Sequence, residues 1–312
     1  MGVRFDQLEP EAQSAIGKAC AHIDGLGSAA SLLIEPLTGG ITNRNYRLIG
    51  GRRDIVLRLH GKDTELLGID RRCEFEAAVQ AASLGLAPGV AGLLEPELYL
   101  ITDFVHAQTA DLGDPDVFAS AVARIKAWHA SPAVSGRFDT FGLAETYART
   151  ASSRGVVRSV GSDRAIDLSK TVGAVFANFY DPLVPGHNDL LGANFLTSTD
   201  EPGRVWLIDW EYAGMNTRWF DLGNFSINNG FDDATNDRLL ELYFGEVTPV
   251  VSARLTLMRV MSDVRESMWG VVQQGISTLD FDYLDYANQH FDRMMMNATT
   301  PSFANALRTA VG

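Results

Sequence analysis

Cysteine, basic residues and long apolar runs are all scarce in this chain, and each scarcity argues against a class of protein. The 312 residues include two cysteines, Cys20 and Cys73, without the spacing of a metal site. We therefore expect free thiols in a reducing compartment. The sequence shows no signal-peptide pattern and no apolar stretch long enough to cross a bilayer. A cytoplasmic location without a membrane partner is the expectation.

Positive charge is in deficit as well. Against 26 Lys and Arg stand 39 Asp and Glu, which gives a formal net charge of −13. This balance argues against nucleic acid as a partner and suits a cationic substrate through long-range attraction. The hydrophobic content of 46% and charged content of 21% are ordinary for a globular enzyme.

A spaced set of polar residues is present between residues 187 and 221. It begins with His187-Asn188-Asp189, and Asn194 follows five residues after Asp189. Phosphoryl transfer from ATP requires a positioned hydroxyl, Mg²⁺ on the phosphates and neutralisation of developing charge. In a loop over residues 184–196, Asp189 would accept a hydrogen bond from the attacking hydroxyl, while the amide oxygen of Asn194 would face the metal.

Asp209 completes the expected metal site. It follows the apolar run 205–208, which predicts a buried strand that delivers the carboxylate rigidly at its end. Taken singly, Asp189 and Asn194 are as well explained by turn hydrogen bonds. The joint pattern favours the catalytic interpretation.

Two further residues are expected to support this loop. His187 stands two residues before the candidate base and is assigned to bracing the loop through a hydrogen bond. Asp221 is assigned to a buried acceptor that holds the same loop.

With these motifs the chain resembles the choline/ethanolamine kinase family, within the wider aminoglycoside-phosphotransferase and protein-kinase-like group, over nearly its whole length. The resemblance implies an α+β, two-lobe protein-kinase-like fold, with a small antiparallel-sheet lobe over residues 1–105 and a larger, mainly helical lobe over 106–312. It implies ATP and Mg²⁺ as cofactors. Asp189 is implied as catalytic base, Asn194 and Asp209 as metal ligands, and Glu211 as a further metal or substrate contact.

Residues 37–48 predict a hairpin whose glycine pair can bring backbone amides close to phosphate oxygens. Alone, such a turn is usually only a turn, but here it resembles the nucleotide-binding loop of the family. The contacts expected from it are Gly39, Gly40, Thr42 and Asn43.

Residues 54–59 predict a strand that projects Arg58 from the face opposite its leucines. Arg58 would reach the ATP phosphates with its fork of N–H groups, and solvent exposure is the alternative. A strand over 98–105 would lead into a hinge, where adenine is expected to contact the backbone from Asp103 to Val105.

A helix is predicted from residue 70 to 84, capped by Asp70 and ended by Gly85. Glu74 would pair with Arg58, with Glu76 as the competing choice. The inward stripe of this helix is expected at Phe75, Ala78, Val79 and Ala82.

The acceptor pocket is read from the C-terminal region. Proteins hold quaternary ammonium groups with aromatic faces, and Trp269 and Tyr286 match two aromatics of the choline site in the resembling family. As plain helix residues both would be core aromatics. Glu266 stands where choline kinases tend to carry a second tryptophan, and a carboxylate there suits a primary ammonium. Alternatively, Arg265 or Arg293 neutralises it.

The sequence thus predicts an ATP-dependent kinase that phosphorylates the hydroxyl of a small cationic amino alcohol of the choline or ethanolamine type. Two alternatives stay open. An aminoglycoside phosphotransferase would share the residues from His187 to Asp209 but not the 269–286 segment, and a nucleotide-binding regulator would keep the fold without turnover. A homodimer is also left open.

Overall fold

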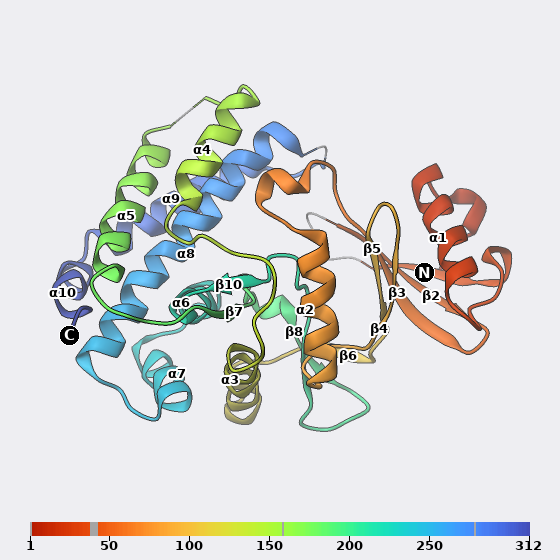
Figure 1. Ribbon diagram of the computed structural model, residues 1–312, viewed down its shortest axis with the longest axis horizontal. Helices are drawn as coiled ribbons and strands as arrows, with labels where there is room; N and C mark the ends of the chain where they lie inside the picture. Colours follow the sequence, from red (N-terminus) through yellow and green to blue (C-terminus); the bar gives the residue numbers. More distant parts are fainter. Residues whose placement is uncertain (1, 38–42, 158, 278) are drawn as a thin grey trace.

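A small lobe built on one sheet stands beside a larger helical lobe in the computed structural model, which describes residues 2–37, 43–157, 159–277 and 279–312 (Figure 1). The expected α+β arrangement is confirmed. The sheet of the small lobe is antiparallel throughout, in the order β1-β2-β3-β5-β4. Its strands are β1 (Leu33–Leu37), β2 (Arg44–Gly50), β3 (Arg53–Leu59), β4 (Val90–Leu94) and β5 (Tyr99–Asp103).

The predicted hairpin is confirmed in its strands, because β1 pairs antiparallel with β2 and Leu37 lies opposite Asn45. Gly39, Gly40 and Thr42 lie outside the described residues. The strand predicted at 54–59 is β3, in which Leu57 and Leu59 are buried and Arg58 alternates to the other face.

Two helices cover the sheet from opposite sides: α1 (Pro10–His22) on the outer side and α2 (Arg71–Ser83) between the sheet and the large lobe (Figure 1). As expected, Asp70 caps α2, since its side chain accepts hydrogen bonds from the backbone N–H groups of Arg72 and Cys73.

The predicted inward stripe of α2 is wrong in part. Ala78 is buried, but Val79 is 42% exposed, and Phe75 and Ala82 are half-buried. The helix buries instead a face made of Arg71, Cys73, Glu74, Ala77, Ala78 and Ala81. Two charged residues lie on this face because they pair with each other and with charges across the cleft, which an apolar pattern does not reveal.

The large lobe is organised around α8 (Pro249–Ile276), a long helix that contacts α4, α5, α6, α9 and α10 (Figure 1). The other helices of this lobe are α3 (Pro115–His129), α4 (Leu143–Ser153), α5 (Val160–Phe176), α6 (Arg218–Asn228), α7 (Asp233–Phe244), α9 (Tyr283–Ala298) and α10 (Pro301–Thr309). Short 3₁₀ helices occur at Phe5–Gln7, Ala29–Ser31, Thr64–Leu67 and Gly192–Asn194.

Short strands join the two lobes at the cleft. The strands β6 (Ala107–Thr109), β8 (Phe195–Ser198) and β9 (Val205–Leu207) form one small sheet, and β7 (Val184–Gly186) pairs with β10 (Gly214–Asn216). The strand predicted before Asp209 is β9, and its three residues are buried. Asp209 therefore follows a buried strand, as the sequence predicts.

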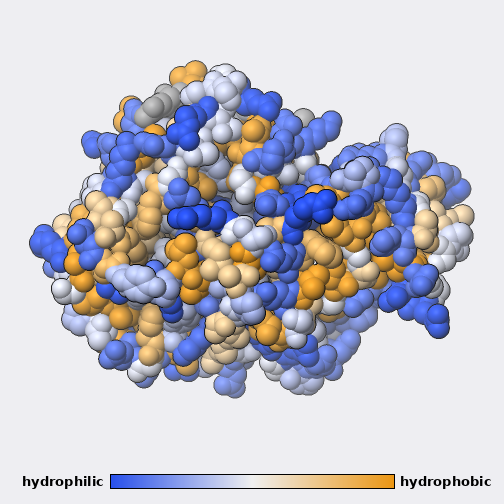
Figure 2. Space-filling model, in the orientation of Figure 1, coloured by the Kyte–Doolittle hydropathy of each residue, from blue (hydrophilic) through white to orange (hydrophobic). Residues whose placement is uncertain are grey.

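The surface carries no continuous apolar belt on the face shown in Figure 2, where hydrophobic residues form separate groups among hydrophilic ones. Within the described ranges, no helix has both the length and the apolar character that crossing a bilayer demands.

The crossing of α6 and α8 depends on Gly223. A Cβ atom added there would lie 2.5 Å from the backbone carbonyl carbon of Met258. Gly223→Ala should therefore lower the free energy of unfolding by about 1–3 kcal/mol, measured by urea-induced unfolding, because backbone rather than a flexible side chain must move.

Gly17→Ala is the matched control. Gly17 also lies inside a helix, α1, but a Cβ atom there would meet nothing within 4 Å. This variant should be neutral or slightly more stable, since alanine favours a helix interior. Equal losses in the two variants would contradict the close-packing explanation.

Candidate active site

The loop between β7 and β8 carries Asp189, and Asp221 on α6 anchors its backbone through hydrogen bonds. The carboxylate of Asp221 accepts hydrogen bonds from the backbone N–H groups of His187 (2.7 Å) and Asn188 (2.6 Å). Its Oδ2 atom also lies 2.9 Å from Nε2 of His129. Burial would raise the pKa of Asp221, but the hydrogen bond and charge of His129 outweigh it, so the pKa lies below its ordinary value. Asp221 thus fixes the backbone before Asp189.

His187 links this loop to the end of β9. Its Nε2 atom lies 2.9 Å from the carbonyl oxygen of Ile208, and its ring packs on Trp210 with centroids 4.7 Å apart. Burial lowers the pKa of His187, which favours a neutral ring that donates this hydrogen bond. The geometry agrees with a bracing role.

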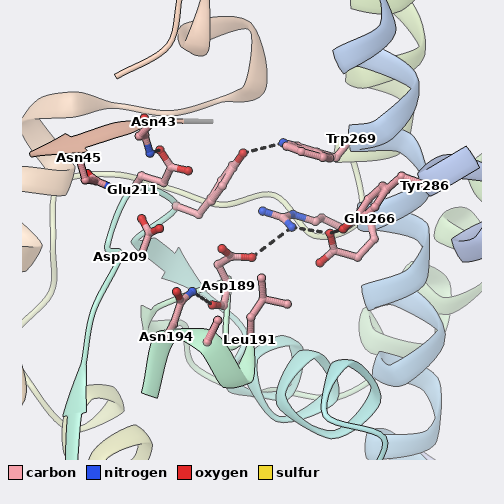
Figure 3. A pocket seen from close by; sticks show the side chains of 13 residues that line it. Asn43, Asn45, Asp189, Leu191, Asn194, Asp209, Glu211, Glu266, Trp269 and Tyr286 are labelled. Atoms are coloured by element: carbon pink, nitrogen blue, oxygen red, sulfur yellow. Dashed lines mark hydrogen bonds and ion pairs between the residues drawn. The ribbon is translucent and has the colours of Figure 1, made fainter. Parts of the chain in front are cut away.

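Two cavities meet beside Asp189. The inner cavity, of about 110 Å³, lies between the two lobes (Figure 3), and the cleft cavity, of about 400 Å³, lies under the sheet of the small lobe. They share Asn45, Ala193, Asn194 and Asp209. Of the residues predicted from the sequence, the inner cavity collects Asn43, Asp189, Asn194, Asp209, Glu211, Glu266, Trp269 and Tyr286. The cleft cavity collects Arg58, Asp103, Val105, Asn194 and Asp209.

The shared edge offers oxygen atoms that fit a hard cation. Asn194 donates its Nδ2 amide to the carbonyl oxygen of Asp189 (2.8 Å), which leaves the Oδ1 oxygen as the other end of the side chain. Asp209 has a φ of +69°, a backbone conformation tolerated better by Asp than by most residues, and this turns the chain sharply after β9. Mg²⁺ in kinases is commonly held by one or two protein oxygens together with phosphate oxygens. Asn194 and Asp209 fit that donor set.

A chain of charged side chains, buried or half-buried, crosses from the small lobe to this edge. Nη1 of Arg58 lies 2.7 Å from Oδ1 of Asp209 and 3.1 Å from Oε1 of Glu74. Glu74 rather than Glu76 is thus the partner of Arg58, while Glu76 accepts a hydrogen bond from the backbone of Ser135.

Arg71 was not singled out from the sequence. Its Nη1 lies 2.7 Å from Glu74 and 3.2 Å from Glu211, and Glu211 also accepts a hydrogen bond from Nδ2 of Asn43 (2.9 Å). An arginine in the first turn of a helix ordinarily reads as a surface residue. No local signal identified its partners.

Asp189 faces a second buried arginine, Arg265 of α8. Nη1 of Arg265 lies 3.2 Å from Oδ1 of Asp189 and 2.8 Å from Oε2 of Glu266. Burial raises the pKa of Asp189 to about 8, because the opposing effect of Arg265 is smaller and nearby carboxylates add to the shift. A raised pKa suits a group that accepts a proton near neutral pH.

The predicted aromatic residues also lie at the inner cavity, but both make hydrogen bonds within the protein. Nε1 of Trp269 donates to the hydroxyl of Tyr212 (2.8 Å), and the hydroxyl of Tyr286 donates to Glu266 (2.8 Å). Of the two arginines proposed to neutralise Glu266, Arg265 is the one in contact.

The anchoring role of Asp221 can be tested by Asp221→Asn. The amide accepts fewer hydrogen bonds and loses the charge opposite His129, so the free energy of unfolding at pH 7 should fall by about 3–5 kcal/mol. Because the pKa of Asp221 is lowered on folding, its contribution is full above its unfolded pKa of about 4 and is lost as the pH falls further. The difference in the free energy of unfolding between wild type and Asp221→Asn should therefore become smaller only as the pH falls below about 4.

Asp237→Asn serves as the control for this measurement. It removes an exposed carboxylate from the neighbouring helix α7 and should change stability little. If the difference in the free energy of unfolding between wild type and Asp221→Asn became smaller already at neutral pH, the lowered pKa of Asp221 would be contradicted.

Comparison with known proteins places this geometry in a family. Residues 33–253 match the phosphotransferase enzyme family. The probable ethanolamine kinase A of Dictyostelium discoideum is 26% identical, with 84% of each chain covered. The structure of a choline/ethanolamine kinase family protein from Mesorhizobium loti is 30% identical with a TM-score of 0.76, covering 89% of this chain and 92% of that one. The choline kinase LicA from Streptococcus pneumoniae shares the fold at 21% identity, with a TM-score of 0.77 over 92% and 98% of the two chains. This chain therefore belongs to the phosphotransferase enzyme family and, within it, to the choline/ethanolamine kinase family.

Proposed function

We propose that this protein transfers the γ-phosphate of ATP to the hydroxyl of a small amino alcohol. The observation that carries the proposal is the meeting of two cavities at Asn194 and Asp209, with Asp189 on the wall of the inner one. A nucleotide in the cleft cavity would present its terminal phosphate at this shared edge, and an alcohol in the inner cavity would approach from the other side. The relatives named as ethanolamine and choline kinases support the substrate class.

The cleft cavity suits a nucleotide. Its walls include the apolar side chains of Val56, Ala78 and Leu100, and it extends to the stretch from Asp103 to Val105. The backbone N–H groups of Asp103 and Phe104 already donate to the carbonyl oxygens of Gly89 and Asp54. Val105 is therefore the residue of this stretch to which the proposal assigns the backbone donor for adenine.

Three groups of the chain act on the reacting atoms in this proposal. Asp189 takes the proton of the substrate hydroxyl, and its position is fixed by the loop that Asp221 holds. Arg58 offers a fork of N–H groups to the phosphates. Asn194 and Asp209 would hold Mg²⁺, which when bound supplies charge neutralisation on the phosphates.

Asp189→Asn is the first test of this proposal. The amide cannot take the proton, so turnover in a coupled assay of ADP release should fall by about 10²–10⁴-fold, while ATP binding is retained because Asp189 lines only the inner cavity. Asp237→Asn on the surface of α7 is the control and should turn over like wild type. Undiminished turnover by Asp189→Asn would remove it from the role of base.

The same assay separates the alternative functions when it is run over a panel of amino alcohols and aminoglycosides. We expect ADP release with amino alcohols. Release with aminoglycosides alone would favour the aminoglycoside phosphotransferase, and nucleotide binding without release for any alcohol would favour the regulator.

The metal requirement gives an independent prediction. Chelation by EDTA should stop turnover, and excess Mg²⁺ should restore it, because the two oxygen donors at the shared edge need a cation to engage the phosphates. Turnover that persists in EDTA would contradict the assignment of Asn194 and Asp209.

A further inference from the structure

The inner cavity already contains a cation that belongs to the protein. Arg265 is 4% exposed, and the central carbon of its guanidinium lies 4.3 Å from the ring centre of Tyr212. Its Nη1 atom contacts carboxylate oxygens of Asp189 and Glu266. An aromatic face with nearby carboxylates is the setting in which proteins bind ammonium ligands. In this protein that setting is filled by Arg265.

Glu266 and the two aromatic side chains on this side of the cavity already have partners within the protein. Oε2 of Glu266 accepts from Arg265 and from the hydroxyl of Tyr286, while Oε1 accepts from Nδ2 of Asn228 (3.2 Å) and from Nδ2 of Asn224 (3.5 Å), so each oxygen already has two donors. The ring of Trp269 meets that of Tyr286 at 66° with centroids 5.4 Å apart. Glu266 therefore has neither oxygen left for a substrate ammonium.

Hydrogen-bond acceptors without a partner lie on the opposite side. In Figure 3, Asn43, Asn45 and Glu211 stand across the cavity from Glu266 and Trp269. The side-chain oxygens of Asn43 and Asn45 are buried and have no hydrogen-bond partner among the described residues. A buried acceptor left unpaired is unfavourable, and a ligand with N–H donors would recover that cost. Glu211 adds negative charge to the same side.

We infer that Arg265 makes this cavity selective for amino alcohols whose nitrogen keeps N–H groups, and unfavourable to quaternary ammonium. The guanidinium covers the Tyr212 face and repels a second cation from it. The amine instead lies against Asn43, Asn45 and Glu211, where its N–H groups find acceptors. The inference rests on the proposed function, since it assumes that the inner cavity takes the amino alcohol.

The substrates themselves provide the first test, with the unaltered protein. Ethanolamine, N-methylethanolamine, N,N-dimethylethanolamine and choline share one hydroxyl and, when protonated, carry from three N–H groups down to none. We expect kcat/KM to fall along this series, with choline about 10²-fold or more below ethanolamine, because buried acceptors left unpaired discriminate strongly. A choline kcat/KM equal to or above that of ethanolamine would overturn the inference.

The role of Arg265 is tested by the double variant R265M/E266Q, with R265K as the matched control. The double variant removes both charges of the buried pair at similar side-chain volume, and R265K keeps the cation. Loss of the Asp189 partner lowers kcat for every alcohol alike, so the readout is the ratio of kcat/KM for choline to that for ethanolamine. This ratio should rise by about tenfold or more in R265M/E266Q, because the charge that repels a quaternary ammonium from Tyr212 is removed, and should stay near wild type in R265K.

An unchanged ratio in a folded R265M/E266Q protein would remove Arg265 as the determinant. The series on the wild-type protein does not depend on the folding of any variant. If none of the four alcohols is phosphorylated, the proposed function fails and the inference with it. If all are phosphorylated and choline is not the poorest, only the inference fails.

Discussion

The cleft of this protein depends on the pairing of carboxylates with guanidinium groups that are buried or half-buried. Removing a charge from water costs several kcal/mol, and the cost is recovered only where an opposite charge lies within hydrogen-bonding distance. Asp209 and Glu211 meet this condition through Arg58 and Arg71, which come from the small lobe. These two carboxylates belong to the large lobe and the two guanidinium groups to the small lobe. The ion pairs that offset the cost of burying the carboxylates therefore also hold the lobes together.

The same pairing of opposite charges is found at the inner cavity. Arg265 stands between Asp189 and Glu266, so two carboxylates that would repel each other share one cation. Asp189 therefore has a partner without being locked into a multiple hydrogen bond, and burial raises its pKa to about 8. The ion pairs of Arg265 and the raised pKa of Asp189 thus have one physical origin, which is the burial of these groups.

The sequence anticipated those parts of the site that local patterns encode. The apolar run before Asp209 predicts a strand, and therefore predicts that Asp209 lies at the end of that strand. The alternation along β3 predicts the face of the sheet on which Arg58 lies. The roles assigned to these residues remain predictions. Arg71 escaped detection because its partner Glu211 lies 140 residues away, and no local pattern encodes such a contact. For Glu266 the choice between two arginines depended on the packing of α9, which brings Arg293 to Asp263 instead (2.6 Å).

In the proposed function, the contact between Arg58 and Asp209 would couple the binding of the metal to the binding of the nucleotide. A carboxylate oxygen engaged by a guanidinium is a weaker ligand for free Mg²⁺ than an unengaged one. A nucleotide that drew Arg58 onto its phosphates would loosen this engagement, so each ligand would increase the affinity for the other by the same factor. Such a protein would capture the metal–nucleotide complex as a unit and would leave the uncomplexed ion in solution.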